Sequence, residues 1–568
     1  MAYGGAATAK KKSRTPKDDG RRVELARDIM AMQERMEGQR GNFNTMWQSV
    51  AERVNPNYSD FTNKHWEGQR RTNRIFDSTA PLALGHGCAA LESMLCPAST
   101  RWHGLRTVDP DLWDDIEIRQ WLDKCTDVMF RVRYSPEANF QAQIEEAFGQ
   151  LLSFGCGPFL VDDIVGRGIR YRARSLCNVY GMENASGRID VVHDKYELTA
   201  QAAVGALKSG MFHRLPDVIL TAAEKEPTRK FEFLHACRPD PEMRNGKSVQ
   251  SCVISMTQQM VVCEYGYHTQ SLLLPRYRVL PTETYGRGPG VDVLPEILML
   301  NEMRKVYLRQ GQRAIEPPLL MAGDGLDAFD LRGNALNPAT MTNDGKPLVQ
   351  PFNVGGNFQV TKEMLDESRT IVQRAFLVDI FSILVQEPRM TATEVLQRAQ
   401  EKGQLLAPIV GRIQAELFGP MITREFDILH RAGQFPPPPD KVLRMGGLKL
   451  EPVYESQIQI AQKQSKALAI GLVFQQAAPL IQADPSVLKS VNMDRTFKSL
   501  VEFNGAPADM LNTPDEMQAK QAAEAQQQQL TNMAQIAGPA SQAIKNLAQA
   551  HTALGSPTPG NMLGGQQP

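Results

Sequence analysis

Hydrophobic residues near the start of the chain recur at every third or fourth position, which is the period of an amphipathic α-helix. The first such series consists of Leu25, Ile29, Met32 and Met36. A second helix is predicted after Asp77 and Ser78, because these residues favour the N-cap position and Pro81 then lies in the first turn. The same spacing predicts helices over about 114–131 and 140–154. We therefore expect a mainly helical first region.

The pattern changes between Gly157 and Leu280, where short segments alternate in part and are rich in β-branched and aromatic residues. These segments are PFLVDDI, GIRYRARS, GRIDVVHDKYEL, KFEFLHACRP, SCVISMT and QMVVCEYGY. A helix is expected among them, with Thr199 as its cap and Gly210 as its stop. The pattern indicates a mostly antiparallel sheet, without the regular strand–helix alternation of nucleotide-binding sheets.

Two long helical segments then enclose a polar insert. The first helix, 291–313, would be about 34 Å long at 1.5 Å per residue, and Pro317 and Pro318 follow it. The insert 314–360 is rich in Gly, Asn, Asp and Pro, which is typical of a compact loop-and-strand unit. Because the second helix, 362–384, returns from the insert, we expect the two helices to pack antiparallel.

The first long helix carries more apolar surface than one neighbouring helix can cover. Its apolar residues are Val293, Leu294, Ile297, Leu298, Leu300, Met303 and Tyr307. An isolated pair of such helices cannot bury so broad a stripe, so we expect further partners to cover the rest. Lys305, Arg309 and Arg313 recur at four-residue spacing and therefore lie close to one face of the same helix.

The last third of the chain is again helical and ends in a low-complexity segment. A helical stretch is predicted over 391–431, with interruptions near Pro408 and at Gly419-Pro420, and FPPPPDKV follows it. Residues 455–511 have an amphipathic helical pattern, whereas Gln and Ala dominate beyond Asp515. Together these elements indicate an α+β fold that is predominantly α, with several core-bearing units.

Composition narrows the possible functions. Lys and Arg together number 63, as do Asp and Glu, so the chain is formally neutral and lacks the basic excess of a protein that grips DNA tightly. The eight cysteines form no CxxC pair and have no histidines at zinc spacing, so we expect buried free thiols and no metal site. No apolar run reaches the length of a membrane span, and the first residues lack the apolar core of a secretory signal.

The segment YGRGPGVDVLPEILMLNE, residues 285–302, poses the question of a phosphate-binding loop. A Walker loop needs GK[ST] at the helix start, whereas here Asp292 would repel a phosphate and Pro289 lacks an N–H to donate. We therefore predict that Gly286, Gly288 and Gly290 permit a tight turn, that Pro289 stiffens it, and that Asp292 stabilises the helix start. A nucleotide-binding enzyme that uses loop 286–290 remains the alternative, and no other catalytic or cofactor site is predicted.

The same segment resembles the start of the first stem helix in the head-to-tail connecting proteins, or portal proteins, of short-tailed bacteriophages. Further stretches resemble this family in the same order: NRIFDSTAPLAL, LESMLCPASTRWHGL, KYELTAQAA, PRMTATEVLQRAQEKGQLLAPIVGRIQAEL and REFDILHRAGQFPPPP. The resemblance covers about residues 40–510, and its specificity comes from the order and spacing of these stretches rather than from a single motif.

The resemblance implies a portal-type fold that assembles as a ring, usually of twelve subunits, at one capsid vertex, with a channel through which double-stranded DNA enters and leaves. The implied parts are a disordered basic N-terminus (1–20), a wing (21–290), stem helix one (291–313), a clip (314–360), stem helix two (361–384), a tunnel loop with a wing helix (385–432), a linker or strand (433–454), a helical crown (455–515) and a Gln-rich tail (516–568).

The resemblance also implies the partners of such a protein. They are the terminase packaging motor, tail adaptor proteins, and capsid and scaffolding proteins, in a virion component that is assembled in the host bacterial cytoplasm and is not an enzyme. A tail adaptor without a channel is a further alternative, but we would expect such an adaptor to lack a wing of this size.

Two groups of residues are candidates for the channel wall. Lys305, Arg309 and Arg313 would each form a belt of positive charge in a ring; the alternative is a solvated outer face, or pairing with Asp366, Glu367 or Asp379 on the returning helix. Glu387, Arg389 and Met390 fall where the tunnel loop of the family projects inward. A neutral chain suits a channel that must not hold its DNA through many phosphate contacts.

Overall fold

The structure is a computed structural model. It describes residues 16–113, 115–164, 168–240, 242, 246–316, 319–321, 349–351, 358–378, 407–444, 450–454, 467–479, 491–493, 496–497, 500 and 517–528. The chain divides into two compact units. The first comprises 1–106, 124–437 and 449–466, and the second comprises 107–123, 438–448 and 467–568.

Helix α1 (Pro16–Gln39) opens the first unit and begins earlier than predicted. The boundary of the disordered N-terminus at residue 20 was therefore wrong; residues 1–15 lie outside the described part. Pro16 is the first residue of the helix, a position at which proline is favoured. The apolar face was predicted correctly, since Leu25 and Ile29 are buried.

Three other helices of the first region follow the predicted pattern. They are α3 (Thr79–Leu95), α5 (Ile116–Arg133) and α6 (Phe140–Phe154), whereas α2 (Gly41–Ala51) and the short η1 (Pro56–Tyr58) after it were not predicted individually. One detail of α3 differs from the prediction. Ser78 holds the N-cap position without a side-chain bond, whereas Asp77 Oδ1 accepts from the backbone N–H of Thr79 at 2.9 Å.

The sequence predicts a mostly antiparallel sheet, and the first unit contains two antiparallel sheets in this region rather than one. The larger has the order β4 (Val179–Glu183), β5 (Ile189–Thr199), β6 (Lys230–Pro239), β7 (Val249–Ser255), β8 (Met260–Tyr267). The smaller has the order β3 (Gly168–Ala173), β2 (Phe159–Ile164), β9 (Leu272–Leu273). Strands β1 (His103–Thr107) and β12 (Leu450–Tyr454) pair separately.

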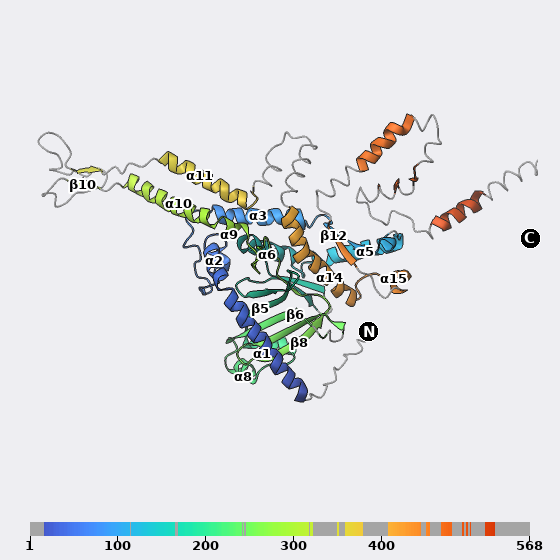
Figure 1. Cartoon of the computed structure of the whole chain (residues 1–568), viewed down its shortest axis with the longest axis horizontal. Helices are drawn as coiled ribbons and strands as arrows, with labels where there is room; N and C mark the ends of the chain where they lie inside the picture. The colour runs from blue at the N-terminus through green and yellow to red at the C-terminus, as the bar shows by residue number, and fades with distance from the viewer. Residues whose placement is uncertain are drawn as a thin grey trace, which may run out of the picture. The chain divides into compact units, whose positions relative to one another are not determined.

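Helices cover both faces of the five-stranded sheet (Figure 1). On one face, Leu25, Ala26 and Ile29 of α1 pack in one cluster with residues of β6, β7 and β8. On the other face, α7 (Ala200–Lys208) and α8 (Asp217–Lys225) pack against Phe231 and Phe233. Thr199 caps α7 as predicted, since its Oγ1 accepts from the N–H of Ala202, whereas α8 and β4 were not predicted.

Two long helices run side by side away from the sheets (Figure 1), and we call them the helical pair. They are α10 (Leu294–Ile315) and α11 (Phe358–Ala375), joined through β10 (Leu319–Met321) and β11 (Val349–Pro351), which pair antiparallel. The predicted helix 291–313 is interrupted at Val293, between α9 (Pro289–Asp292) and α10. Helix α11 ends before the predicted residue 384, because Leu377 takes a left-handed conformation with φ 64°. Residues 379–384 lie outside the described part.

A helical stretch over 407–431 follows and contains one wide turn. The segment η3 (Gln414–Phe418) is a π-helical turn, and α14 (Gly419–Arg431) continues from it. The sequence predicted an interruption at Gly419-Pro420, and the structure has it as this turn. In the second unit, α4 (Pro110–Trp113), the start of α5, α15 (Asp440–Arg444) and helices over 467–479 and 517–528 are described.

Candidate functional site

The glycine-rich segment lies against the end of helix α6. A Cβ atom on Gly286 would lie 2.3 Å from the carbonyl oxygen of Gly155, and one on Gly288 would lie 2.6 Å from that of Leu152. A Cβ atom on Gly290 would lie 2.6 Å from the carbonyl oxygen of Ser153. Distances this short exclude any side chain. The segment is therefore glycine-rich because two backbones touch.

The structure thus gives these glycines a further reason that the sequence did not show, which is close contact with another backbone. None of the three has the positive φ that a left-handed turn would need. The positive φ instead belongs to Gly155, at 92°, where a Cβ atom would lie 2.5 Å from the backbone of Arg287. The two segments therefore exclude side chains reciprocally, and we call this the glycine contact.

The glycine contact does not offer a phosphate cradle. A cradle presents N–H donors to the ligand, whereas the glycine faces here meet carbonyl oxygens of α6. Pro289 is buried as the first residue of α9. The carboxylate of Asp292 receives a hydrogen bond from Arg278 Nη1 at 3.1 Å, so it neutralises a cation close to the start of the helical pair.

Asn301 joins α10 to the segment that precedes α3. Its buried Oδ1 accepts hydrogen bonds from the backbone N–H of Phe76 at 2.8 Å and of Asp77 at 3.2 Å. Its Nδ2 donates to the carbonyl oxygen of Ile297 at 2.9 Å, which fixes the amide orientation. The segment before α3 thus has its backbone donors satisfied by the helical pair itself.

Asp77 joins the same segment to α11. Its Oδ2 accepts from Arg369 Nη2 at 2.7 Å and Nε at 3.1 Å, while Oδ1 accepts from Thr79. Burial raises the pKa of Asp77, but the hydrogen bonds from Thr79 and Arg369 outweigh burial and lower it below its ordinary value. Further along, a Cβ atom on Gly87 would lie 2.8 Å from the carbonyl oxygen of Phe376, so α3 and the end of α11 also touch closely.

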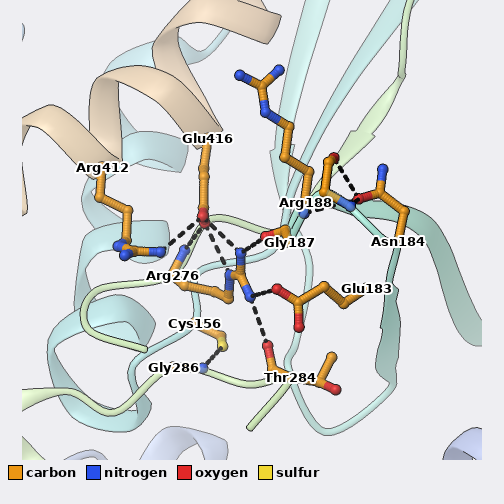
Figure 2. Close-up of polar contacts among 11 residues, drawn as sticks. Cys156, Glu183, Asn184, Gly187, Arg188, Arg276, Thr284, Gly286, Arg412 and Glu416 are labelled. Atoms are coloured by element: carbon orange, nitrogen blue, oxygen red, sulfur yellow. Dashed lines mark hydrogen bonds and ion pairs between the residues drawn. The ribbon is translucent and has the colours of Figure 1, made fainter. Parts of the chain in front are cut away.

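The buried side chain of Arg276 lies next to the glycine contact, and we call the set of its hydrogen-bond partners the arginine hub (Figure 2). Arg276 Nη2 and Nε donate to the two carboxylate oxygens of Glu416, at 2.8 and 3.2 Å. Nη1 donates to Glu183 at 3.2 Å and to the carbonyl oxygen of Thr284 at 3.1 Å, and Nη2 also donates to that of Gly187. Burial lowers the pKa of Arg276, but the hydrogen bonds and charges of Glu416 and Glu183 outweigh burial and raise this pKa above its ordinary value, so the guanidinium stays charged.

The three predicted channel cations lie on α10 but differ in their surroundings. Lys305 is partly buried, 5.3 Å from the ring centre of Phe76, and forms an ion pair with Glu302 at 3.4 Å. Arg309 and Arg313 are exposed and make no ion pair with any described residue. Asp366, an alternative partner, pairs with Arg369 instead. Glu387, Arg389 and Met390 lie outside the described residues, so their channel role stays a prediction.

The helical pair exposes apolar side chains. Of the predicted apolar stripe, Ile297 and Leu300 are buried, whereas Leu298, Met303 and Tyr307 are only partly covered. Further large apolar residues on the pair are exposed: Met299, Val306, Leu308 and Ile315 on α10, and Met364 and Ile371 on α11. The two helices therefore do not complete each other's burial.

Several residues of this site escaped sequence analysis. Asn301, Arg369, Arg276 and Glu416 were not singled out, and Asp77 was noted only as a cap. Their partners lie far away in sequence; Asp77 and Arg369, for example, are 292 positions apart. No local pattern marks such a pair.

Two further observations concern sites of other kinds. Within the described ranges, no three His, Cys, Asp or Glu side chains come together in a way that could hold a metal ion. No helix in this part of the chain combines the length and the apolar character needed to cross a membrane.

Proteins similar to this chain include two bacteriophage proteins and one solved structure. A probable portal protein of Bordetella phage BPP-1 is 21% identical over 516 residues, covering 88% of this chain and 91% of that protein. The portal protein of Salmonella phage epsilon15 is 22% identical over 534 residues, covering 91% and 94%. The neck of a native GTA particle, computed with C12 symmetry, aligns at a TM-score of 0.34 with 11% identity over 74% of this chain and 94% of that chain, a likeness too distant to argue from.

A family profile gives the decisive comparison. Residues 26–511 match the profile described as bacteriophage head to tail connecting protein, which confirms the resemblance seen in the sequence. The chain belongs to the bacteriophage head to tail connecting protein family.

Proposed function

We propose that this chain is a bacteriophage portal protein, which forms a ring at one vertex of the capsid and passes double-stranded DNA through its centre. The observation that carries the proposal is the family match over residues 26–511. In the ring, residues 21–290 would be the wing, α10 and α11 the stem, and the segment between them the clip.

The exposed apolar residues of the helical pair support a ring. Water-exposed Met299, Val306 and Leu308 on a helix that already has a partner need a second contact to be buried. In a closed ring each subunit presents two different faces to its two neighbours, so every copy receives the same cover. A second copy of this chain is therefore the occupant that we assign to this surface.

The charges on α10 support a channel through which DNA slides. Arg309 and Arg313 are exposed and uncompensated among the described residues, so in a ring they would repeat as belts of positive charge. Lys305, already paired with Glu302, would contribute less. Because each phosphate contact adds to affinity, a small number of weak belts allows DNA to move. We assign Glu387, Arg389 and Met390 to the tunnel loop on the resemblance alone.

The partners follow from this role. The clip would offer a surface to the terminase motor during packaging and to tail adaptors afterwards, while capsid and scaffolding proteins would surround the wing. The driving force would come from the motor, because the glycine contact of this chain is filled by backbone atoms of α6.

Electron microscopy of the purified full-length chain tests the proposal. We expect class-averaged top views to show closed rings with a central hole. A particle that stays a single copy at every concentration and salt condition would contradict the proposal. Calorimetric titration with ATP tests the enzyme alternative, for which saturable binding in the micromolar range would be required.

A further inference from the structure

Arg276 differs from the other buried arginines in that each of its guanidinium N–H groups has a hydrogen-bond acceptor in the arginine hub. A guanidinium has five N–H donors, and those of Arg276 reach Glu416, Glu183, Gly187 and Thr284. The backbone N–H of Arg276 donates to Glu416 as well, at 3.0 Å. Its side chain is 1% exposed. Burying a charge so fully is costly unless every donor is used, and here every donor is used.

Glu416, whose carboxylate accepts from both Nε and Nη2 of Arg276, belongs to the π-helical turn. The N–H of Gly419 donates to the carbonyl oxygen of Gln414, five residues earlier. Pro420 lacks an N–H and cannot continue the α-helical pattern, which accounts for the wide turn. The hydroxyl of Tyr454 on β12 donates to the same oxygen of Gln414 at 3.0 Å. Glu416 therefore projects from a turn whose width is fixed from several sides.

One further partner of Arg276, Thr284, belongs to the path that leads into the helical pair, whereas Glu183 and Gly187 lie at the end of β4 and in the turn after it. Thr284 lies two residues before the glycine contact begins, and Gly286 donates its N–H to Cys156 Sγ at 3.2 Å (Figure 2). The chain then passes through the glycine contact into α9 and α10. A single side chain thus holds the π turn and the entry to the helical pair at once.

We propose that Arg276 is a coupling residue, which makes the π turn at Gln414–Phe418 and the entry to the helical pair at 284–292 move as one body. The coupling runs through the fork between the guanidinium and the Glu416 carboxylate, because a fork fixes direction as well as distance. A point charge at the same place would keep the attraction and lose the orientation.

A second buried pair in the same unit serves as the matched control. Arg133 on α5 is as buried as Arg276, and its partner Glu425 on α14 is more buried than Glu416. Their ion pair also holds the 407–431 helix, but Arg133 makes no hydrogen bond or ion pair with the described residues 284–292. Arg133 Nη1 has no hydrogen-bond partner among the described residues, unlike any nitrogen of the Arg276 guanidinium. Losing this pair should loosen α14 without loosening the entry to the helical pair.

Hydrogen–deuterium exchange of the purified full-length chain tests the coupling. For Arg276→Lys we expect peptides 284–300 and 407–418 both to exchange at least about tenfold faster than in the wild type. For Arg133→Lys we expect faster exchange in 419–431, with 284–300 within about twofold of the wild type. Glu416→Gln, which keeps the side-chain shape, should give the Arg276→Lys pattern at smaller amplitude and covers the case in which Arg276→Lys does not fold.

Either of two results would overturn the proposal. One is acceleration confined to 407–418 in both hub variants, which would make Arg276 a local support of the π turn. The other is equal acceleration of 284–300 by Arg133→Lys, which would mean general loosening. Neither result depends on the proposed portal function, because the readout is backbone exchange. Failure of the portal proposal would appear instead as the absence of rings.

Discussion

The five-stranded sheet and the helical pair bury their apolar residues in opposite ways. The sheet has helices on both faces, and its central residues Phe233 and Leu234 are completely buried within the chain. The helical pair buries a single seam around Ile297 and Leu300 and leaves apolar side chains on both helices in water. Both regions have the hydrophobic periodicity of folded elements, so periodicity alone does not separate them.

The difference shows where each region obtains its stability. The sheet region draws its free energy of folding from contacts inside one chain, as an independent core does. A few specific contacts instead attach the helical pair to the rest of the first unit. They are the glycine contact, the hydrogen bonds of Asn301, and the ion pair of Asp77 with Arg369. Substitutions in the sheet should therefore affect the single chain, and substitutions on the pair should affect assembly.

The largest effect is expected in the sheet core. Phe233→Ala removes a fully buried ring that stacks with Phe212 and Tyr196 at centroid distances of 5.5 and 6.0 Å. The lost transfer energy and the cavity should lower the free energy of unfolding by about 3–5 kcal/mol. Denaturant titration followed by circular dichroism measures it. Phe233→Leu, which keeps most of the volume, should cost much less; equal losses would place the core elsewhere.

A smaller but still large loss is expected at the glycine contact. Gly288→Ala places a methyl group 2.6 Å from the carbonyl oxygen of Leu152 and 2.7 Å from that of Leu151, so the two backbones must separate. We expect a loss of about 1–3 kcal/mol in the free energy of unfolding. Gly311→Ala on α10 is the control, because nothing lies within 4 Å of its Cβ position, and it should gain up to about 1 kcal/mol.

These two regions also differ in how much the sequence reveals. The sheet strands and helix α6 were predicted because their periodicity is local, whereas β4, a short strand at the edge of its sheet, was missed. The glycines were singled out, but their contact with α6 was not predicted, because a sequence shows that a Cβ is absent but not which atom occupies its place. The contacts of Arg276 and Asp77 depend on distant partners and leave no trace in spacing.

The ion pair at the root of the helical pair should give a defined pH dependence. The pKa of Asp77 lies below its ordinary value of 3.8 in the fold. Its contribution to stability is therefore present above the unfolded-state pKa and is lost as the pH falls through the folded-state pKa, that is, below about pH 4. Asp77→Asn should lower the free energy of unfolding by about 1–3 kcal/mol at neutral pH and flatten this acid limb.

The second carboxylate on Arg369 provides the control for that prediction. Asp366 also pairs with Arg369, at 3.0 Å, but its side chain is exposed to solvent. Asp366→Asn should therefore change the free energy of unfolding by less than about 0.5 kcal/mol. If both variants flattened the acid limb equally, the two carboxylates that pair with Arg369 would contribute alike, and the burial of Asp77 would not explain the pH dependence.

The smallest effect on the single chain is expected on the exposed face of the helical pair, and it is the most informative about assembly. Val306 on α10 and Val23 on α1 are almost equally exposed, at 47% and 48%. Val306→Ser and Val23→Ser should each change the free energy of unfolding of a single chain by less than about 0.5 kcal/mol, because neither side chain is buried there.

If a second copy covers α10, only Val306→Ser places a polar group at a position that is buried in the interface. The fraction of closed rings, counted by electron microscopy over a dilution series, should then fall for Val306→Ser and stay at the wild-type level for Val23→Ser. Equal ring fractions for both variants would mean that this face of α10 is solvated in the assembly, and the contrast between the self-contained sheet and the dependent helical pair would lose its basis.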